Sequence, residues 1–301
     1  MSLLRYLNGE AHDLDGSLAA TAIADAQGIS VIDPNGSLRR LGDAGGPVAR
    51  SVTALATAPG TYITGLSSGL VQLLTHCGTA RVWQLPGPLV SSVAANDDWL
   101  AAATDYAAYF WSVDAEAVHE PQMESLGLGE IRFLAPNRVA WLRSELVSQV
   151  QLGPDYFVVT WADGRVGQGR IACDRAATNL RMLSATGIVV AVLGDLIVCG
   201  DASGHISIVD AESGRKTYCF VAHEDALEAL ALGPDGLIAS ATTTELKVWR
   251  LGRTFPPAVQ HRATAQALAP ASPLIARFRS LQFIAERLAI GLELGFVVDS
   301  E

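Results

Sequence analysis

Residues 222–250 read AHEDALEALALGPDGLIASATTTELKVWR, and this stretch decides the fold. An apolar run ends at Leu232 and is followed by Pro234, Asp235 and Gly236, a combination typical of tight turns. After the turn come a run of small residues, LIASA, and then a run with alternating apolar side chains, LKVW. Short apolar runs of this kind, separated by turn residues, predict antiparallel β-strands and not helices.

The same order, a turn followed by a strand of small residues, recurs along the whole chain. The residues just before these strands are Gly16, Gly60, Asp98, Asp155, Asp195, Gly236 and Glu286, at intervals of 44, 38, 57, 40, 41 and 50 residues. Most intervals lie close to the ~40–45 residues of one four-stranded propeller blade. Since each small-residue run also has one apolar run before it and up to two after it, four strands per unit are predicted. The sequence therefore predicts an all-β fold, a seven-bladed β-propeller of four-stranded antiparallel blades.

The stretch at 222–250 resembles the repeat of the WD-repeat family. It has a His near its start (His223), a Pro-Asp-Gly turn, Ser240 in the small-residue strand and Trp249 near the end of the next strand. The resemblance implies that His223, Ser240 and Trp249 belong to a hydrogen-bonded set inside one blade. In the family a turn Asp completes that set. Here Thr243 occupies the place where the Asp is expected, and Arg250 replaces the final Asp, so the set is expected to be incomplete.

Both long intervals contain segments that look like insertions between blades of a single domain spanning residues 1–301. One is a hairpin, IRFLAPNRVAWLRS at 131–144, and the other is a proline-bearing loop at 253–273. The strand assignment of 115–155 stays open. The last unit provides only three strands, whereas SLLRYL at 2–7 has no local partner. Donating this first strand to the last blade would close the ring and cover an exposed sheet edge.

Composition argues against several classes of partner. The formal net charge of -10 leaves no basic stripe for binding nucleic acid. No apolar stretch approaches the ~18 residues of a membrane helix, so membrane insertion is not expected. The four cysteines form no CxxC pair, and three of them lie within apolar runs, which favours buried free thiols. The predicted location is the cytoplasm.

Local motifs for catalysis or metal binding are weak throughout the chain. DLDG at 13–16 lacks the further oxygen ligands of a calcium loop, and GRVGQGR at 164–170 lacks the Lys-Ser/Thr ending and the following helix of a phosphate loop. His76 and Cys77 are adjacent, but no base is placed beside them. We therefore expect no catalytic residue, no metal and no cofactor. The alternative is a propeller enzyme of the hydrolase or lactonase type, with its metal or catalytic site in the central channel.

The favoured function is a non-catalytic scaffold that binds a partner protein or peptide on one propeller face, and a role as a subunit of a larger complex stays open. In a propeller, the loops between the second and third strands of the blades gather at one face, and rigidly held loops are common binding sites. The residues expected on this partner-binding face are Gln27, Ser68, Tyr106, Asp163, Ser203, Thr244 and Glu293.

Overall fold

The fold was established from a computed structural model. It describes residues 3–6, 11–17, 20–25, 28–32, 38–41, 47–55, 58, 60–75, 78–105, 107–112, 138–141, 146–171, 180–252, 257–264, 277–284, 287–292 and 295–298.

Within these residues the strands form seven four-stranded antiparallel sheets. From the innermost to the outermost strand they are β2 (Ala11–Ser17), β3 (Ala20–Asp25), β4 (Gly28–Ile32) and β5 (Leu38–Leu41); β6 (Ala49–Ala54), β7 (Tyr62–Leu66), β8 (Leu70–Thr75) and β9 (Gly78–Gln84); β10 (Val90–Ala95), β11 (Trp99–Thr104), β12 (Ala107–Ser112) and β13 (Arg138–Trp141); β14 (Val147–Leu152), β15 (Tyr156–Trp161), β16 (Arg165–Arg170) and β17 (Arg181–Thr186); β18 (Val189–Leu193), β19 (Leu196–Gly200), β20 (His205–Asp210) and β21 (Lys216–Val221); β22 (Ala229–Leu232), β23 (Leu237–Ala241), β24 (Glu245–Arg250) and β25 (Ala258–Thr264); and β26 (Phe278–Ile284), β27 (Arg287–Leu292), β28 (Gly295–Val298) and β1 (Leu3–Tyr6).

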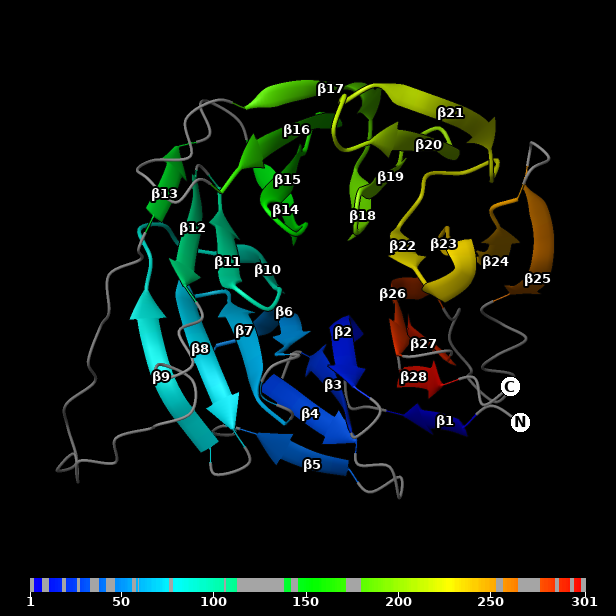
Figure 1. Cartoon of the computed structure of the whole chain (residues 1–301). Coiled ribbons are helices and arrows are strands. Elements are labelled where there is room, and N and C mark those ends of the chain that lie inside the picture. Colours follow the sequence, from blue (N-terminus) through cyan, green and yellow to red (C-terminus); the bar gives the residue numbers. More distant parts are fainter. Residues whose placement is uncertain are drawn as a thin grey trace, which may run out of the picture.

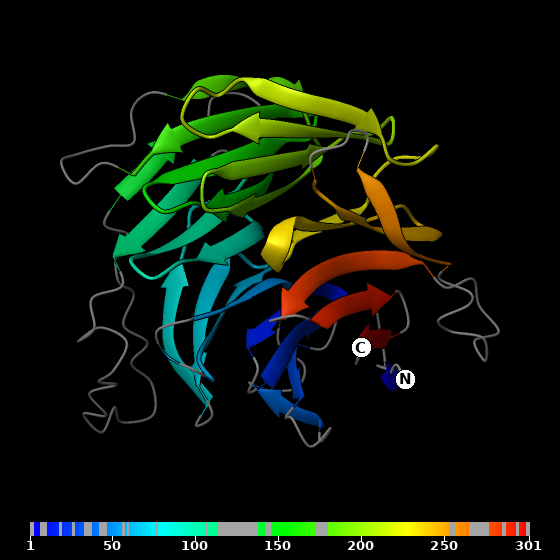
Figure 2. The same ribbon diagram turned by 45° about the vertical axis from the view of Figure 1, so that its right-hand side comes forward.

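The sheets are arranged in a ring, with the first strand of each sheet nearest the centre (Figure 1). The view turned by 45° shows the sheets following one another around this ring, each with its strands side by side (Figure 2). We call each sheet a blade. The seven-bladed propeller predicted from the repeat is therefore confirmed, and the small-residue strands are the second strands of the blades.

The core lies between neighbouring blades and not within a single central layer. In β15, YFVVTW, every residue is buried, because one face packs on the preceding blade and the other on the following blade. Phe110 of β12 and Phe157 of β15 illustrate one such contact, with ring centroids 4.8 Å apart. Continuous apolar strands are thus required by the architecture.

Side-chain hydrogen bonds also join the innermost strands of adjacent blades. The bridges run from the Val93 N–H to Ser51 Oγ (3.1 Å), from the Ser92 hydroxyl to the Val150 carbonyl (3.3 Å), and from the Val190 N–H to Gln149 Oε1 (2.9 Å). They connect β6, β10, β14 and β18 in series. These four strands therefore form one hydrogen-bonded inner wall.

The first described strand of the chain lies in the same sheet as the last three. β1 pairs antiparallel with β28, with Leu3 opposite Val298 and Tyr6 opposite Gly295. This is the pairing that the unpartnered SLLRYL segment predicted. That the ring depends on this strand for its closure, and that residues 1–301 form a single domain, stay predictions.

The two segments interpreted as insertions each contribute a blade strand. Within 131–144, Arg138–Trp141 is β13, the outermost strand of its blade. Within 253–273, Ala258–Thr264 is β25, which pairs with β24. No residue of β25 is buried, so the strand lacks the apolar alternation by which strands are recognised in a sequence. The remaining residues of both segments lie outside the described part of the chain.

The cysteine prediction holds for one of the two cysteines that the structure describes. Cys199 is buried, and its burial raises the pKa of the thiol to about 12, whereas Cys219 on β21 is exposed. Alternation along an outermost strand turns Cys219 toward solvent although it lies within an apolar run. Over the described ranges, no helix is long and apolar enough to cross a membrane.

Candidate binding face and the hydrogen-bonded blade

The turns between the second and third strands lie at one end of the ring, which we call the upper end. Four of the seven predicted binding residues are described there, and each is exposed: Ser68, Asp163, Ser203 and Thr244. Each lies in the turn that joins the second and third strands of its blade. Gln27, Tyr106 and Glu293 lie outside the described residues. The structure thus brings four predicted residues to corresponding positions in four blades.

Backbone and side-chain hydrogen bonds hold these turns in place. Asp201 Oδ1 accepts the N–H groups of Ser203 (2.8 Å) and His205 (3.0 Å). Gly204 closes this turn with a φ of +78°, and a Cβ at this position would lie 2.2 Å from the His223 carbonyl oxygen. Only glycine fits there without displacing the neighbouring segment. The upper turns are therefore rigid supports for exposed side chains.

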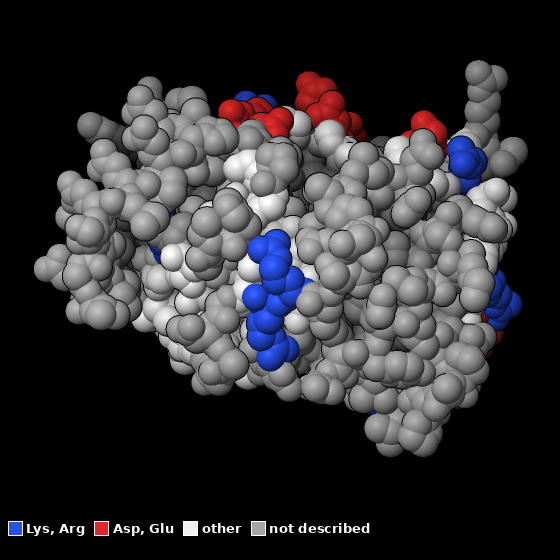
Figure 3. Space-filling view, turned by 90° about the horizontal axis from the view of Figure 1, so that it is seen from below, with Lys and Arg blue, Asp and Glu red and all other residues white. Residues whose placement is uncertain are grey.

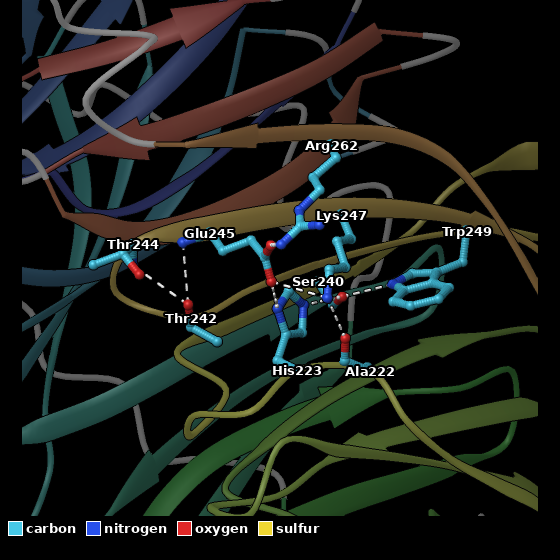
Figure 4. A network of polar contacts seen from close by, with 9 residues as sticks. All are labelled: Ala222, His223, Ser240, Thr242, Thr244, Glu245, Lys247, Trp249 and Arg262. Carbon is cyan, nitrogen blue, oxygen red and sulfur yellow. Dashed lines mark hydrogen bonds and ion pairs between the residues drawn. The ribbon is translucent and has the colours of Figure 1, made fainter.

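A buried polar network fills the blade of β22–β25 (Figure 4). The Trp249 indole N–H donates to Ser240 Oγ at 2.8 Å, and Ser240 Oγ lies 2.9 Å from His223 Nε2. On the other side of the imidazole, His223 Nδ1 lies 3.0 Å from Glu245 Oε2. The set that the resemblance implied is present, with Glu245 as its acidic member.

The expectation that this set would be incomplete at Thr243 is therefore wrong. The Thr243 carbonyl accepts the Phe278 N–H at 2.9 Å, so this residue ties its blade to the next. Glu245, the first residue of β24, has the longer side chain that reaches His223 from the strand itself. Lys247 and Arg262 form ion pairs with the same carboxylate, and Lys247 Nζ also donates to the Ala222 carbonyl at 2.7 Å.

The network fixes the tautomer of His223. A carboxylate only accepts hydrogen bonds, so Nδ1 carries the proton that is donated to Glu245. Nε2 then accepts the Ser240 hydroxyl proton, while Ser240 Oγ accepts from Trp249. Burial lowers the pKa of His223 and outweighs the hydrogen bond that His223 donates to Glu245, which acts in the opposite direction. The imidazole is consequently neutral near pH 7.

Glu245 stays ionised over the same range. Burial alone would raise the pKa of its carboxyl, but hydrogen bonds from Lys247 and His223, together with the charge of Lys247, lower it further than burial raises it.

Ser240, His223 and Glu245 have the order and spacing of a hydrolase triad, yet the arrangement is unsuited to catalysis. Ser240 is 0% exposed and His223 is 2% exposed, so no substrate carbonyl can approach the hydroxyl. The Ser240 oxygen also accepts the Trp249 N–H, which occupies a lone pair of the would-be nucleophile. The network therefore stabilises the blade. In the part of the chain that the structure describes, no group of three or more His, Cys, Asp or Glu side chains is placed to hold a metal ion.

Acid is expected to destabilise the protein through His223. Its pKa in the folded state lies below the ordinary 6.5, so the unfolded chain takes up a proton at a higher pH than the folded chain does. Stability contributed by the neutral imidazole is present above about pH 6.5 and is lost as the pH falls below it. Melting temperatures from about pH 7 to about pH 5 should fall further for the wild type than for His223→Gln. Parallel pH profiles of the two proteins would contradict this role.

Exposed carboxylates lie at both ends of the ring, and those of the upper end include Asp163, Glu224 and Asp225. At the lower end, the turns between the first and second strands carry exposed carboxylates, namely Asp97, Asp98, Asp155, Asp195 and Asp235. Figure 3, which faces the side wall of the ring, shows a stripe of basic side chains on the wall and acidic side chains along one edge.

Comparisons with known proteins support the fold. No family model matches the sequence, and no curated protein matches it. Among solved structures, the chain is similar to the WD40 β-propeller domain of Doa1, with a TM-score of 0.76 and 13% identity over 99% of this chain and 95% of that one. It is also similar to a chain of the Mitotic Checkpoint Complex, with a TM-score of 0.75 and 15% identity over 98% and 92% of the two chains. At these identities the likeness establishes the WD40 β-propeller fold.

Proposed function

Because the chain has the fold of WD40 β-propeller domains, we propose that it is a non-catalytic interaction module that binds a partner protein or peptide at its upper end. The observation that carries this proposal is the set of exposed turn residues Ser68, Asp163, Ser203 and Thr244 at corresponding positions of four blades. Fixed turns lower the entropic cost of binding, because little of the surface has to be ordered when a partner arrives.

Two further observations favour a scaffold. Ser240 and His223 are buried, and the hydrogen bond between them lies inside the blade, away from any substrate. One of the structures that the chain resembles is that of a complex. We place the protein in the cytoplasm, as its sequence predicts.

Arginine substitutions on the upper turns should abolish partner capture. Ser68→Arg, Ser203→Arg and Thr244→Arg together place three bulky cations on exposed turn positions without touching the buried network. We expect captured partners to fall by about tenfold or more, since a buried unpaired charge costs more than the ~1.4 kcal/mol of a tenfold change. The measurement is quantitative affinity capture from the native organism, followed by mass spectrometry.

A matched control carries three arginines on exposed positions of the lower end. Pro154→Arg, Leu193→Arg and Ala258→Arg change the net charge by the same amount. Proteins captured by the wild type and by this control, but lost with the upper variant, are partners of the proposed face. If both variants capture the same proteins in the same amounts, the upper end is not the binding face.

A further inference from the structure

The innermost strands share an irregularity at their upper ends. In five blades of the described chain, the pairing of the first strand with the second skips one residue near the start of the first strand. The skipped residues, which form β-bulges, are His12, Arg50, Ser91, Ser148 and Arg279. In the other two blades, Ile188 and Glu228 occupy the corresponding position just before β18 and β22.

A β-bulge re-aims the side chain of the extra residue. Arg50 is exposed although Ala49 and Ser51 on either side of it are buried. Its place in the chain fixes the end of the ring: Ala49 pairs with Leu66, and the turn containing Ser68 follows directly. The bulge residues thus surround the axis of the ring at the upper end, inside the circle of exposed turns.

Two arginines of this inner circle lie close together in the ring. The innermost strands β26, β2 and β6 are neighbours in the ring, and their bulge positions are Arg279, His12 and Arg50. We call Arg279 and Arg50, one on each side of β2, the basic arc. Arg277, which is exposed, precedes β26 on the same side. The next three positions around the ring are Ser91, Ser148 and Ile188, and the seventh is Glu228, the one acidic member, which lies beside the position of Arg279 because β22 neighbours β26.

We propose that the basic arc binds carboxylate side chains of an acidic segment in the partner protein. Arginine suits this task because its planar guanidinium donates two parallel hydrogen bonds to one carboxylate. Two such arginines on either side of β2 can hold two carboxylates of one extended segment. The inference rests on the proposed function, since it names the chemistry of the ligand at the same face.

Short labelled peptides test this preference without knowledge of the natural partner. Fluorescein-labelled hexaglutamate, hexaglutamine and hexalysine are titrated with the full chain at low ionic strength, and binding is read as fluorescence anisotropy. Hexaglutamate should bind most tightly, and its affinity should fall steeply with added salt. Arg50→Gln should weaken it by roughly threefold to tenfold, and Arg50→Gln with Arg279→Gln by roughly thirtyfold or more.

Arg170→Gln is the matched control, because this exposed arginine ends β16 at the lower end and its loss changes the net charge equally. It should leave hexaglutamate binding within about twofold of the wild type. Because Arg279 is partly buried, melting curves are recorded for both variants. If the double variant unfolds, the comparison of the wild type with Arg50→Gln decides the test, since Arg50 is exposed. Equal affinities of the wild type and Arg50→Gln would overturn the proposal, as would stronger binding of hexalysine or of a single-stranded hexathymidylate.

The two proposals fail in distinguishable ways. If Arg50→Gln weakens hexaglutamate binding but the arginine substitutions on the upper turns leave partner capture unchanged, the preference for carboxylates is supported and the proposed binding face for the partner is wrong. If those substitutions abolish capture but Arg50→Gln leaves hexaglutamate binding unchanged, the upper end is the binding face and the preference for an acidic segment is wrong.

Discussion

A protein that lacks residues 1–8 is expected to melt at a temperature on the order of 5–10 °C below that of the full chain. The deletion removes β1 and leaves the edge of β28 without its partner strand. With four residue pairs lost and about 1 kcal/mol for each net hydrogen bond, a loss of roughly 3 kcal/mol is expected before any side-chain packing is counted. Calorimetry or circular dichroism measures the shift.

Two companion experiments separate strand pairing from an unspecific effect of truncation. Leu4→Pro keeps the full length but removes one backbone donor within β1, so it should lower the melting temperature in the same direction by a smaller amount. A synthetic peptide with the sequence MSLLRYLN should raise the melting temperature of the truncated protein in proportion to the logarithm of its concentration. A truncated protein that melts like the full chain would show that ring closure does not depend on β1.

Trp249→Ala is expected to lower the free energy of unfolding by about 3–5 kcal/mol, and by more than any single substitution on the upper turns. The indole is only 5% exposed and packs edge-on against Phe220, with ring centroids 5.1 Å apart. Its removal leaves a cavity and also leaves Ser240 Oγ without a donor. Chemical denaturation with a constant m-value measures the loss.

Trp249→Phe distinguishes the hydrogen bond from the packing. This variant keeps an aromatic ring but loses the N–H that donates to Ser240. Trp111→Phe is the matched control, because Trp111 occupies the corresponding place in its blade, is equally 5% exposed, and has an indole nitrogen with no hydrogen-bond partner in the described structure. Trp249→Phe should cost about 1–2 kcal/mol more than Trp111→Phe. Equal losses would mean that the network adds nothing to packing.

The blade repeat was predictable because it depends on local chemistry. Turn residues such as Pro234, Asp235 and Gly236 impose a reversal of the chain, and the small residues after them fit between two neighbouring sheets. These signals are present even in blades that carry few of the residues typical of the WD-repeat family. β25 escaped prediction for the opposite reason, since it lies at the rim with exposed side chains and nothing in its sequence marks it as a strand.

The candidate site was predictable only in part. The turn positions follow from counting strands, so Ser68, Asp163, Ser203 and Thr244 could be placed at one end in advance. The role of Glu245 could not, because it depends on the length of a side chain that reaches His223 across the blade. Arg277 and Arg279, which flank Phe278, stand out in the sequence as a basic spot, but Arg50 was missed, because a β-bulge is a property of the pairing between two strands and the sequence of one strand does not reveal it.

The bridges of the inner wall bear on how far the blades can be treated as copies. Each bridge uses a different pair: a serine accepts at Val93, a glutamine accepts at Val190, and Ser92 donates to a carbonyl. The blade of β10 or that of β14, moved to another place in the ring, would lose its bridges on both sides. These blades are therefore fitted to their neighbours and are not interchangeable copies of one repeat.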